Sequence, residues 1–409
     1  ETIEDDTKAN PMNFKLRRGA ENIFYAESAS DMDTLEYKLA VTYKEPKPSQ
    51  TLPKRIAKKL QNRKKLIIRD VYGLKTWCFK KAFSFFKHFA KKNGDIILFA
   101  SGSRAEIGGN EKVIYDRMIE RGLDSKYKFR FDFKASITVN RSIPAMIRFV
   151  YYLATSDIIL IDDYYPDIYL VDYPKNVKVL QVWHACGAFK KWGYSTLDLA
   201  WGGSREDMLR FPMHNTYTDV FVSSEAIIPC YAEAFRCSER RIKAFGTPRT
   251  DVYFDKSFVS SQREEMLKIF PEIGERKIIL YAPTFRGNSP TAAYNENPLD
   301  YEELKAALGD EYALVMKLHP FTAKKFGLTE EEKEKYGDFI FDGSKSLKIE
   351  TALCAADILI ADYSSLIFEY ALLDKPMLFY AYDLEEYEHD RSFYFDYKSF
   401  VPGKIVINN

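Results

Sequence analysis

Short apolar runs that alternate with amphipathic helical stretches dominate the chain from residue 95 onward. A strand that is apolar throughout is buried on both faces, as in a parallel sheet covered by helices. The runs form two series, which predict two doubly wound α/β domains with a break near Pro271–Glu275. They are Asp95–Ala100, Asp157–Ile161, Val177–Val182, Val220–Val222 and Ile242–Phe245, then Lys277–Ala282, Ala313–Leu318, Asp338–Phe341, Asp357–Ala361 and Pro376–Tyr380.

The length and composition exclude several other classes of protein. A chain of 409 residues is long for one core, and 46% hydrophobic and 15% aromatic residues exclude a disordered chain. The 60 basic and 59 acidic residues leave a net charge of +1, so we expect no nucleic-acid partner. The sequence contains no run of about 18 uncharged apolar residues, so we expect no membrane-spanning helix. Five cysteines without CxxC spacing indicate reduced thiols in a cytoplasmic protein rather than a zinc site or a disulfide framework.

The N-terminal part differs from the rest of the chain. Alternating polar and apolar residues between Phe14 and Tyr43 predict one or two strands, the remnant of a β-rich module. Residues 44–50 are polar with two prolines, so we interpret 1–50 as an N-terminal extension that ends in a linker. The first residue is Glu1 rather than Met, and we expect the sequence to be incomplete at both ends.

Residues 51–93 form a strongly basic segment with aromatic residues at helical spacing. A basic amphipathic helix of this kind is attracted to an anionic membrane surface. The alternative is a helix that packs its phenylalanines on the core and exposes its lysines to water. A nucleic-acid role is the least favoured reading. The residues expected to contact a membrane are Lys80, Lys81, Phe83, Phe86 and Lys87.

Chemically informative side chains follow directly after five of the predicted strands. The carboxyl ends of parallel strands share one edge of a sheet, so the side chains at two facing sheets can line one cleft. Each segment alone also fits a structural role, such as a backbone-bonded histidine, a Gly-Pro turn or a plain helix N-cap. Together they indicate a site for a group with several phosphates. The segments are Gln181–Lys191, Phe245–Asp251, Leu280–Arg286, Lys317–Pro320 and Asp357–Tyr370.

Two histidines stand out among these residues. His184 follows a predicted strand, and an imidazole can accept a proton near neutral pH. Gly187 allows the backbone to approach a ligand beside it. Lys317 and His319 alternate on one side of a strand end, so both can point at one ligand.

Arginines and hydroxyls complete the candidate anion site. An arginine fork matches a phosphate, and N–H groups with hydroxyls at a helix N-terminus can hold one. Glu369, about one turn after Ser365, can accept hydrogen bonds from ribose hydroxyls. No Walker P-loop or GxGxxG is present, which argues against an NTPase or a dinucleotide-dependent dehydrogenase. The other candidates are Gly246, Thr247, Pro248, Arg249, Thr284, Arg286, Asp362, Ser364 and Ser365.

In this order, the five segments resemble the CDP-glycerol glycerophosphotransferase family of teichoic-acid and capsule synthesis. The similarity extends from Asp95 to Gly403 and includes the tail segments Tyr380–Tyr387 and Arg391–Tyr397. It implies a GT-B architecture of two Rossmann-like domains facing a cleft, an acceptor domain over 94–272 and a CDP-polyol donor domain over 273–409. It also implies peripheral attachment to the cytoplasmic face of a bacterial membrane.

The resemblance further implies a reaction and roles for the residues. Glycerol phosphate or ribitol phosphate passes from a CDP-polyol to a hydroxyl of a lipid-linked acceptor, and CMP leaves. His184 corresponds to the proposed base and His319 to the histidine that assists at the phosphates. Arg249, Arg286 and the pair Ser364 and Ser365 correspond to groups that hold the pyrophosphate. No cofactor is evident, although Mg²⁺ carried by the substrate phosphates leaves no motif.

Two departures from the family pattern bear on the substrate. The segment Trp183–Lys190 is longer than the family's Trp-His-Gly form and looks more like members that use ribitol phosphate or extend a primed polymer. Lys317 stands where many relatives carry arginine, so a phosphate contact there is monodentate. The chain also ends before the closing helices usual in the family, so we expect the donor domain to be incomplete.

Several alternatives stay open at this point. The sequence does not decide between glycerol and ribitol, between single addition and polymerisation, or between a monomer and a homo-oligomer. A GT-B glycosyltransferase that uses a sugar nucleotide is the main alternative activity. A non-catalytic scaffold that binds lipid or polymer is another, and the clustered histidines and arginines argue against it.

Overall fold

The structure, a computed structural model, falls into two units, residues 1–75 and 76–409, which are described separately. It describes residues 2–5, 14–18, 22–31, 36–44, 73–197, 199–200, 202–205, 208, 213–287, 294, 298–319, 322–323 and 325–407. No helix among these residues is long and apolar enough to cross a membrane.

The first unit contains a four-stranded antiparallel sheet in the order β1-β2-β3-β4. Its strands are Thr2–Asp5, Phe14–Arg18, Asn22–Asp31 and Glu36–Lys44. The sequence predicted only one or two strands here. Residues 45–72, which include most of the expected linker and the first part of the basic segment, lie outside the described residues.

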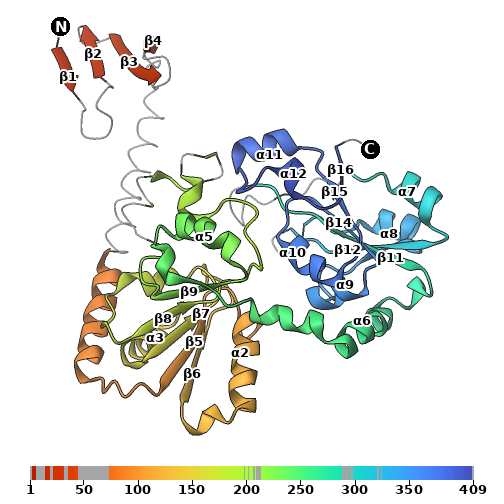
Figure 1. Cartoon of the computed structure of the whole chain (residues 1–409), viewed down its shortest axis with the longest axis horizontal. Coiled ribbons are helices and arrows are strands. Elements are labelled where there is room, and N and C mark those ends of the chain that lie inside the picture. Colours follow the sequence, from red (N-terminus) through yellow and green to blue (C-terminus); the bar gives the residue numbers. More distant parts are fainter. Residues whose placement is uncertain are drawn as a thin grey trace. The chain divides into compact units, whose positions relative to one another are not determined.

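The second unit begins with a six-stranded parallel sheet in the order β10-β9-β8-β7-β5-β6 (Figure 1). Central strands such as β5 and β7 are almost fully buried, which explains their uninterrupted apolar sequence. The strands are β5 Ile96–Ser101, β6 Lys128–Phe133, β7 Ile158–Ile161, β8 Lys178–Gln181, β9 Asp219–Val222 and β10 Ile242–Ala244.

Helices cover both faces of this sheet. The helix over residues 73–89 and α3 (Ile143–Thr155) pack on one face, where Phe83 and Phe149 join Leu98 in the core. On the other face Ile114 and Tyr115 of α2 (Gly109–Glu120) pack on Phe99. The helix α5 (Ile228–Phe235) precedes β10.

A second six-stranded parallel sheet follows, in the order β13-β12-β11-β14-β15-β16. The α/β prediction with two parallel sheets is therefore confirmed. The strands are β11 Lys277–Ala282, β12 Tyr312–Met316, β13 Ile340–Asp342, β14 Ile358–Ala361, β15 Met377–Tyr380 and β16 Lys404–Val406. The helices of this part are α6 Lys256–Ile269, α7 Tyr301–Leu308, α8 Glu330–Tyr336, α9 Ile349–Ala355, α10 Leu366–Tyr370, α11 Leu384–Asp390 and α12 Tyr397–Phe400.

The two sheets are connected by more than the chain that links them. Met266 of α6 packs in the core of the second sheet, so this helix precedes β11 but covers its face. Phe189, from the loop after β8, is buried in the same core. In return, the tail after α11 reaches the first sheet, where the hydroxyl of Tyr394 lies 2.6 Å from that of Ser195. The domain boundary expected at 272/273 stays a prediction.

The basic helix presents a different aromatic face from the one we expected. Phe83 is only 2% exposed, because it fills the core between the helix and the sheet, and therefore cannot contact a membrane. Phe86 is half-buried against Tyr151 of α3. The exposed aromatic residues are instead Trp77, Phe85 and Phe89, and the rings of the last two touch each other.

Candidate anion-binding and catalytic site

His184 stands on a strained loop directly after β8. The preceding residue, Trp183, has φ +48°, a left-handed conformation that is rare for a bulky residue. Gln181 fixes this turn, because its Oε1 accepts a hydrogen bond of 2.8 Å from the Trp183 N–H. The two rings of Trp183 and His184 stack with centroids 4.6 Å apart. The loop therefore holds the imidazole in one orientation.

A carboxylate lies behind this imidazole. Oδ1 of Asp163, which follows β7, is 3.4 Å from Nδ1 of His184, and the His184 side chain is 44% exposed. Desolvation by surrounding protein atoms acts to lower the pKa of His184, but the charge and the hydrogen bond of Asp163, together with the charge of Asp162, raise it overall. Burial acts to raise the pKa of Asp163, and the imidazole pulls it down to about 2. The pair can therefore serve as a general base whose Nε2 is free to take a proton.

His319 follows β12 and lies near enough to His184 for the two charges to interact, and the region around the two histidines is called the compartment below. Burial lowers the pKa of His319 to about 4, and the charges of Lys190 and His184 lower it further in the same direction. Phe285, from the loop after β11, contacts the His319 ring at a centroid distance of 4.7 Å. The two histidines, 135 positions apart in the chain, thus act on each other electrostatically, one with a raised and one with a lowered pKa.

Further cationic groups surround this compartment. Burial lowers the pKa of Lys190 to about 7, and Arg391 lowers it too, while Asp362 opposes them. Nε of Arg391 is buried and has no hydrogen-bond partner among the described residues, and the same holds for Oγ1 of Thr284. Buried donors without partners are costly, so such groups point to a missing acceptor. The arrangement can bind and neutralise an anion with several oxygens.

Arg249 connects the two sheets at one side of the compartment. Its Nη2 pairs with Glu369 of α10, which is 1% exposed, while Nε is buried without a partner in the described part of the chain. Oε2 of Glu369 also accepts a hydrogen bond of 3.0 Å from Tyr253. Glu369 is therefore occupied by protein donors and is not open to ribose hydroxyls, contrary to our expectation.

Asn110, at the start of α2, joins two of the site loops. Its Nδ2 donates to the carbonyl oxygen of Trp183 at 2.7 Å. Its Oδ1 accepts the Arg249 N–H at 2.9 Å. The side chain is 1% exposed, so both bonds are shielded from water. Asn110 thereby fixes the loops of His184 and Arg249 relative to each other.

The sequence comparison decides the family. The sequence model of the family described as CDP-Glycerol:Poly(glycerophosphate) glycerophosphotransferase matches residues 82–409, which is most of the chain. The chain belongs to this glycerophosphotransferase family. The predicted family is therefore confirmed.

Curated members of the glycerophosphotransferase family are similar over long stretches. The teichoic acid ribitol-phosphate polymerase TarL of Staphylococcus aureus is 40% identical over 93% of this chain and 66% of its own length. The teichoic acid poly(ribitol-phosphate) polymerase of Bacillus spizizenii is 39% identical over 83% of this chain and 53% of its own length. The chain thus spans between about half and two-thirds of these relatives.

A solved structure has the same fold. The structure of the wall teichoic acid polymerase TagF superimposes with a TM-score of 0.65 at 20% identity, over 88% of this chain and 87% of that chain. At this identity the likeness supports the two-sheet architecture alone.

Arg286 has a structural role in this member of the glycerophosphotransferase family. Its guanidinium is 3% exposed, and it donates to Asp383 at 2.6 Å and to Asp362 at 2.8 Å. All three of its nitrogens donate to protein oxygens. Asp362 also accepts the N–H of Thr284 and is fully engaged. These protein contacts hold both groups in place, and their expected contact with the pyrophosphate stays a prediction.

Lys317 is likewise occupied by the protein. Its Nζ donates to the carbonyl oxygens of Gly343, Ser344 and Leu347 at 3.2, 3.0 and 2.6 Å. An ammonium has three donors, so none is left for a phosphate. Lys317 organises the loop between β13 and α9 instead of contacting the donor.

The glycines of the site differ in role. A Cβ on Gly187 would lie 2.5 Å from the ring of Phe368, so Gly187 permits close packing of the two sheets and leaves no room for a ligand. Gly246 has φ +94° and open space beside it, which suits a backbone that faces a ligand. Thr247 is buried, and Pro248 begins the short helix η6 (Pro248–Phe254).

The serine pair lies at the end of β14. Ser364 Oγ accepts the Leu366 N–H at 3.3 Å, whereas Ser365 caps α10 without a side-chain bond. Because α10 has only five residues, its dipole contributes little, and the hydroxyls are the groups that can reach a phosphate.

Four residues of the site were not predicted as site residues from the sequence: Asn110, Asp163, Lys190 and Arg391. Asp163 follows β7 as His184 follows β8, so its position after a buried strand was a usable signal. Lys190 and Arg391 stand within the segments that resembled the family. Asn110 lies in a helix start with no recognisable motif.

Proposed function

We propose that the chain transfers polyol phosphate from a CDP-polyol to a hydroxyl of a lipid-linked teichoic-acid or capsule acceptor and releases CMP. The observation that carries the proposal is the shared compartment of His184 and His319, with Lys190 and Arg391 around it. Membership in the glycerophosphotransferase family supports the same reaction.

The geometry fits a direct displacement at phosphorus. Nε2 of His184 takes the proton of the acceptor hydroxyl, while Asp163 stabilises the imidazolium that forms. The acceptor oxygen attacks the phosphorus that bears the polyol, the bond from that phosphorus to the oxygen of CMP breaks, and CMP carries away the electron pair. Lys190, Arg391 and Arg249 neutralise the charge on the phosphate oxygens, and positioning supplies much of the rate.

Ribitol phosphate is the polyol that we favour. The relatives named ribitol-phosphate polymerases are about as similar to this chain as the ribitol-phosphate primase of Bacillus spizizenii, at 40% and 37% identity. The glycerol-phosphate primase of Bacillus subtilis is 34% identical over a shorter stretch of 268 residues. A solved TagF variant was soaked with CDPG, which fits a CDP-polyol donor in this fold. Any Mg²⁺ that the reaction uses arrives with the substrate phosphates, since such a cation is held mainly by phosphate oxygens and water.

We also propose peripheral attachment to the cytoplasmic face of the membrane. Trp77, Phe85 and Phe89 are 57%, 60% and 68% exposed on the helix over residues 73–89. Lys80 and Lys81 are exposed on the same helix, and Lys81 lies over the Trp77 ring. On α3, Ile143 and Ile147 are 77% and 51% exposed. Exposed aromatic residues beside lysines suit an anionic bilayer surface.

A donor panel tests the transferase proposal. With a primed lipid acceptor, the chain is expected to release CMP from CDP-ribitol faster than from CDP-glycerol, and to leave UDP- and GDP-sugars intact. Turnover of sugar nucleotides in preference to both CDP-polyols would instead support a glycosyltransferase. Acceptor binding without any nucleotide turnover would support a scaffold.

A further inference from the structure

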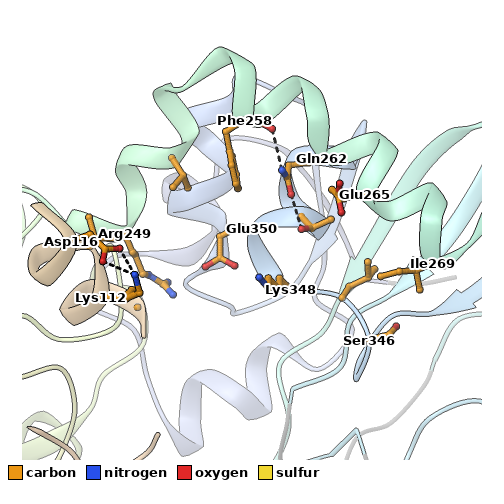
Figure 2. A pocket seen from close by; sticks show the side chains of 15 residues that line it. Lys112, Asp116, Arg249, Phe258, Gln262, Glu265, Ile269, Ser346, Lys348 and Glu350 are labelled. Atoms are coloured by element: carbon orange, nitrogen blue, oxygen red, sulfur yellow. Dashed lines mark hydrogen bonds and ion pairs between the residues drawn. The ribbon is translucent and has the colours of Figure 1, made fainter. Parts of the chain in front are cut away.

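A pocket of about 730 Å³ opens beside Arg249, on the side of the molecule where α2, α6 and the start of α9 meet (Figure 2). This volume is typical of sites for small ligands and cofactors. Val113 and Val252 contribute apolar surface, and Phe258 contributes a ring. Arg249 is the one member of the proposed phosphate site among its lining residues, so the transfer chemistry leaves most of the pocket unexplained.

Glu350 is the acidic group of this pocket that no donor within the described residues occupies. It is half-buried on the first turn of α9, and no hydrogen bond or ion pair to it exists within the described part of the chain. Figure 2 shows it beside Lys348, with Arg249 at one end of the pocket. The other acids of the wall have partners of their own, because Asp116 pairs with Lys112 and Glu265 with Lys268. The carboxylate oxygens of Glu350 are therefore open to a donor that a ligand brings into the pocket.

Arg249 is shared by the pocket and the proposed phosphate site. This arginine lines the pocket, and its charge acts on His184. Burial raises the pKa of Glu369 on the neighbouring helix α10, Arg249 opposes this, and the charge of Glu350 raises it further. A molecule whose phosphates lie near Arg249 and His184 can therefore extend its other end toward Glu350.

The chemistry of the wall favours a nucleobase over a polymer segment. A polyanion would meet the unpaired carboxylate of Glu350, which repels it. Cytosine instead presents an exocyclic amine, a donor that carboxylates accept in base recognition. Uracil has a carbonyl oxygen at that position, which would face the carboxylate oxygens without a proton between them.

We propose that this pocket holds the cytosine of the CDP-polyol and that Glu350 accepts a hydrogen bond from its exocyclic amine, which selects cytidine over uridine donors. This inference deepens the proposed transferase function and rests on it. Glu350 is then a specificity-determining residue, and Phe258 and Val113 supply apolar contact for the ring.

Calorimetric titration of CMP and of UMP into the full chain tests the assignment. A hydrogen bond to a charged group contributes enough for the wild type to bind CMP about 10- to 100-fold more tightly than UMP. Glu350→Gln is expected to lower CMP affinity by about tenfold and to bring the CMP-to-UMP ratio near one, because an amide can also donate to uracil. Val113→Trp, which fills the pocket, is expected to weaken both nucleotides.

The matched control is Glu265→Gln, the same change at an acid of the pocket wall that already pairs with Lys268. It is expected to bind both nucleotides like the wild type, and thermal unfolding reports whether each variant is folded. The assignment is overturned if Glu350→Gln keeps the affinity and the ratio of the wild type, or if the wild type binds CMP no better than UMP. Selective CMP binding that depends on Glu350, without any CMP release from CDP-polyols, would retain this assignment and reject the transferase proposal. CMP release from CDP-polyols with an unchanged CMP-to-UMP affinity ratio in Glu350→Gln would retain the transferase proposal and reject this assignment.

Discussion

Nδ1 of His184 lies 3.4 Å from Oδ1 of Asp163. A neutral histidine carries one N–H, and a carboxylate at Nδ1 fixes that proton there, which leaves Nε2 as the acceptor. The strained Trp183 turn and its hydrogen bond to Gln181 keep the ring in this position. The ends of β7 and β8 therefore position the two side chains that carry out the proton transfer.

His184→Ala is expected to lower the rate of CMP release by about 10²- to 10⁴-fold, the usual contribution of a general base. The side chain is 44% exposed, so its removal leaves little cavity and the thermal unfolding temperature is expected to stay close to that of the wild type. Steady-state CMP release with saturating donor and acceptor measures the loss. Near-normal turnover would remove His184 from the mechanism.

Asp163→Asn is expected to shift the pH dependence of the rate. Asp163 raises the pKa of His184 against the effect of burial, and the base is active in its neutral form. In the wild type the rate therefore rises with pH through this raised pKa. In Asp163→Asn the rising limb moves to lower pH, and the plateau is lower because the imidazolium loses its partner. A limb that stays at the wild-type pH would show that Asp163 does not act on the base.

Lys190 is expected to make donor binding sensitive to pH. Burial and Arg391 lower the pKa of Lys190 to about 7, so the ammonium is lost as the pH rises through that value. The KM for the CDP-polyol is then expected to increase above pH 7. Lys190→Arg keeps its charge at these pH values, and its KM is expected to stay flat. An equal rise in both proteins would assign the effect to another group.

Substitution of Arg286 is expected to lower mainly the stability of the fold, whereas substitution of Arg391 is expected to weaken mainly CDP binding. Arg286→Ala leaves Asp362 and Asp383 without their buried partner, which costs about 3–5 kcal/mol in the free energy of unfolding. Arg391→Ala removes a buried donor that lacks a protein acceptor, so it is expected to weaken CDP binding with a smaller loss of stability. Denaturant unfolding and calorimetry of CDP measure the two effects. Weaker CDP binding in Arg286→Ala, together with a larger loss of stability in Arg391→Ala, would assign the phosphate contact to Arg286.

The exposed aromatic residues of the basic helix are expected to govern membrane binding. A Trp77→Ser, Phe85→Ser and Phe89→Ser triple variant is expected to lose co-sedimentation with anionic vesicles, and wild-type binding is expected to weaken as salt rises. Phe83→Ala instead removes a core side chain and is expected to lower stability by about 3–5 kcal/mol. Equal wild-type binding to neutral and anionic vesicles would contradict an electrostatic contribution to membrane binding.

The central strands were predictable from sequence, but the edge strands were not. β7 reads Ile-Ile-Leu-Ile because both of its faces are buried. β6, at the edge of the first sheet, reads Lys-Phe-Arg-Phe-Asp-Phe and is mostly half-buried or exposed, so it did not resemble a parallel strand. β16 is another edge strand of only three residues.

The position of the site was also predictable, but the partners of its charged groups were not. Both histidines and Arg249 lie at strand ends, as parallel-sheet topology requires. Arg286 and Lys317 follow strands in the same way, yet Asp383 and the carbonyl oxygens of residues 343–347 occupy them. Asp383 is 97 positions from Arg286, and the three carbonyl oxygens are 26 to 30 positions from Lys317, so a single sequence gives no measure of these contacts.

A crystal structure of His184→Ala with CDP-ribitol tests the central claim most directly, because this variant is expected to bind the donor without consuming it. Electron density for one diphosphate is expected within hydrogen-bonding distance of His319, Lys190 and Arg391. A diphosphate that lies away from these three groups, at Arg286 or outside the compartment, would contradict it.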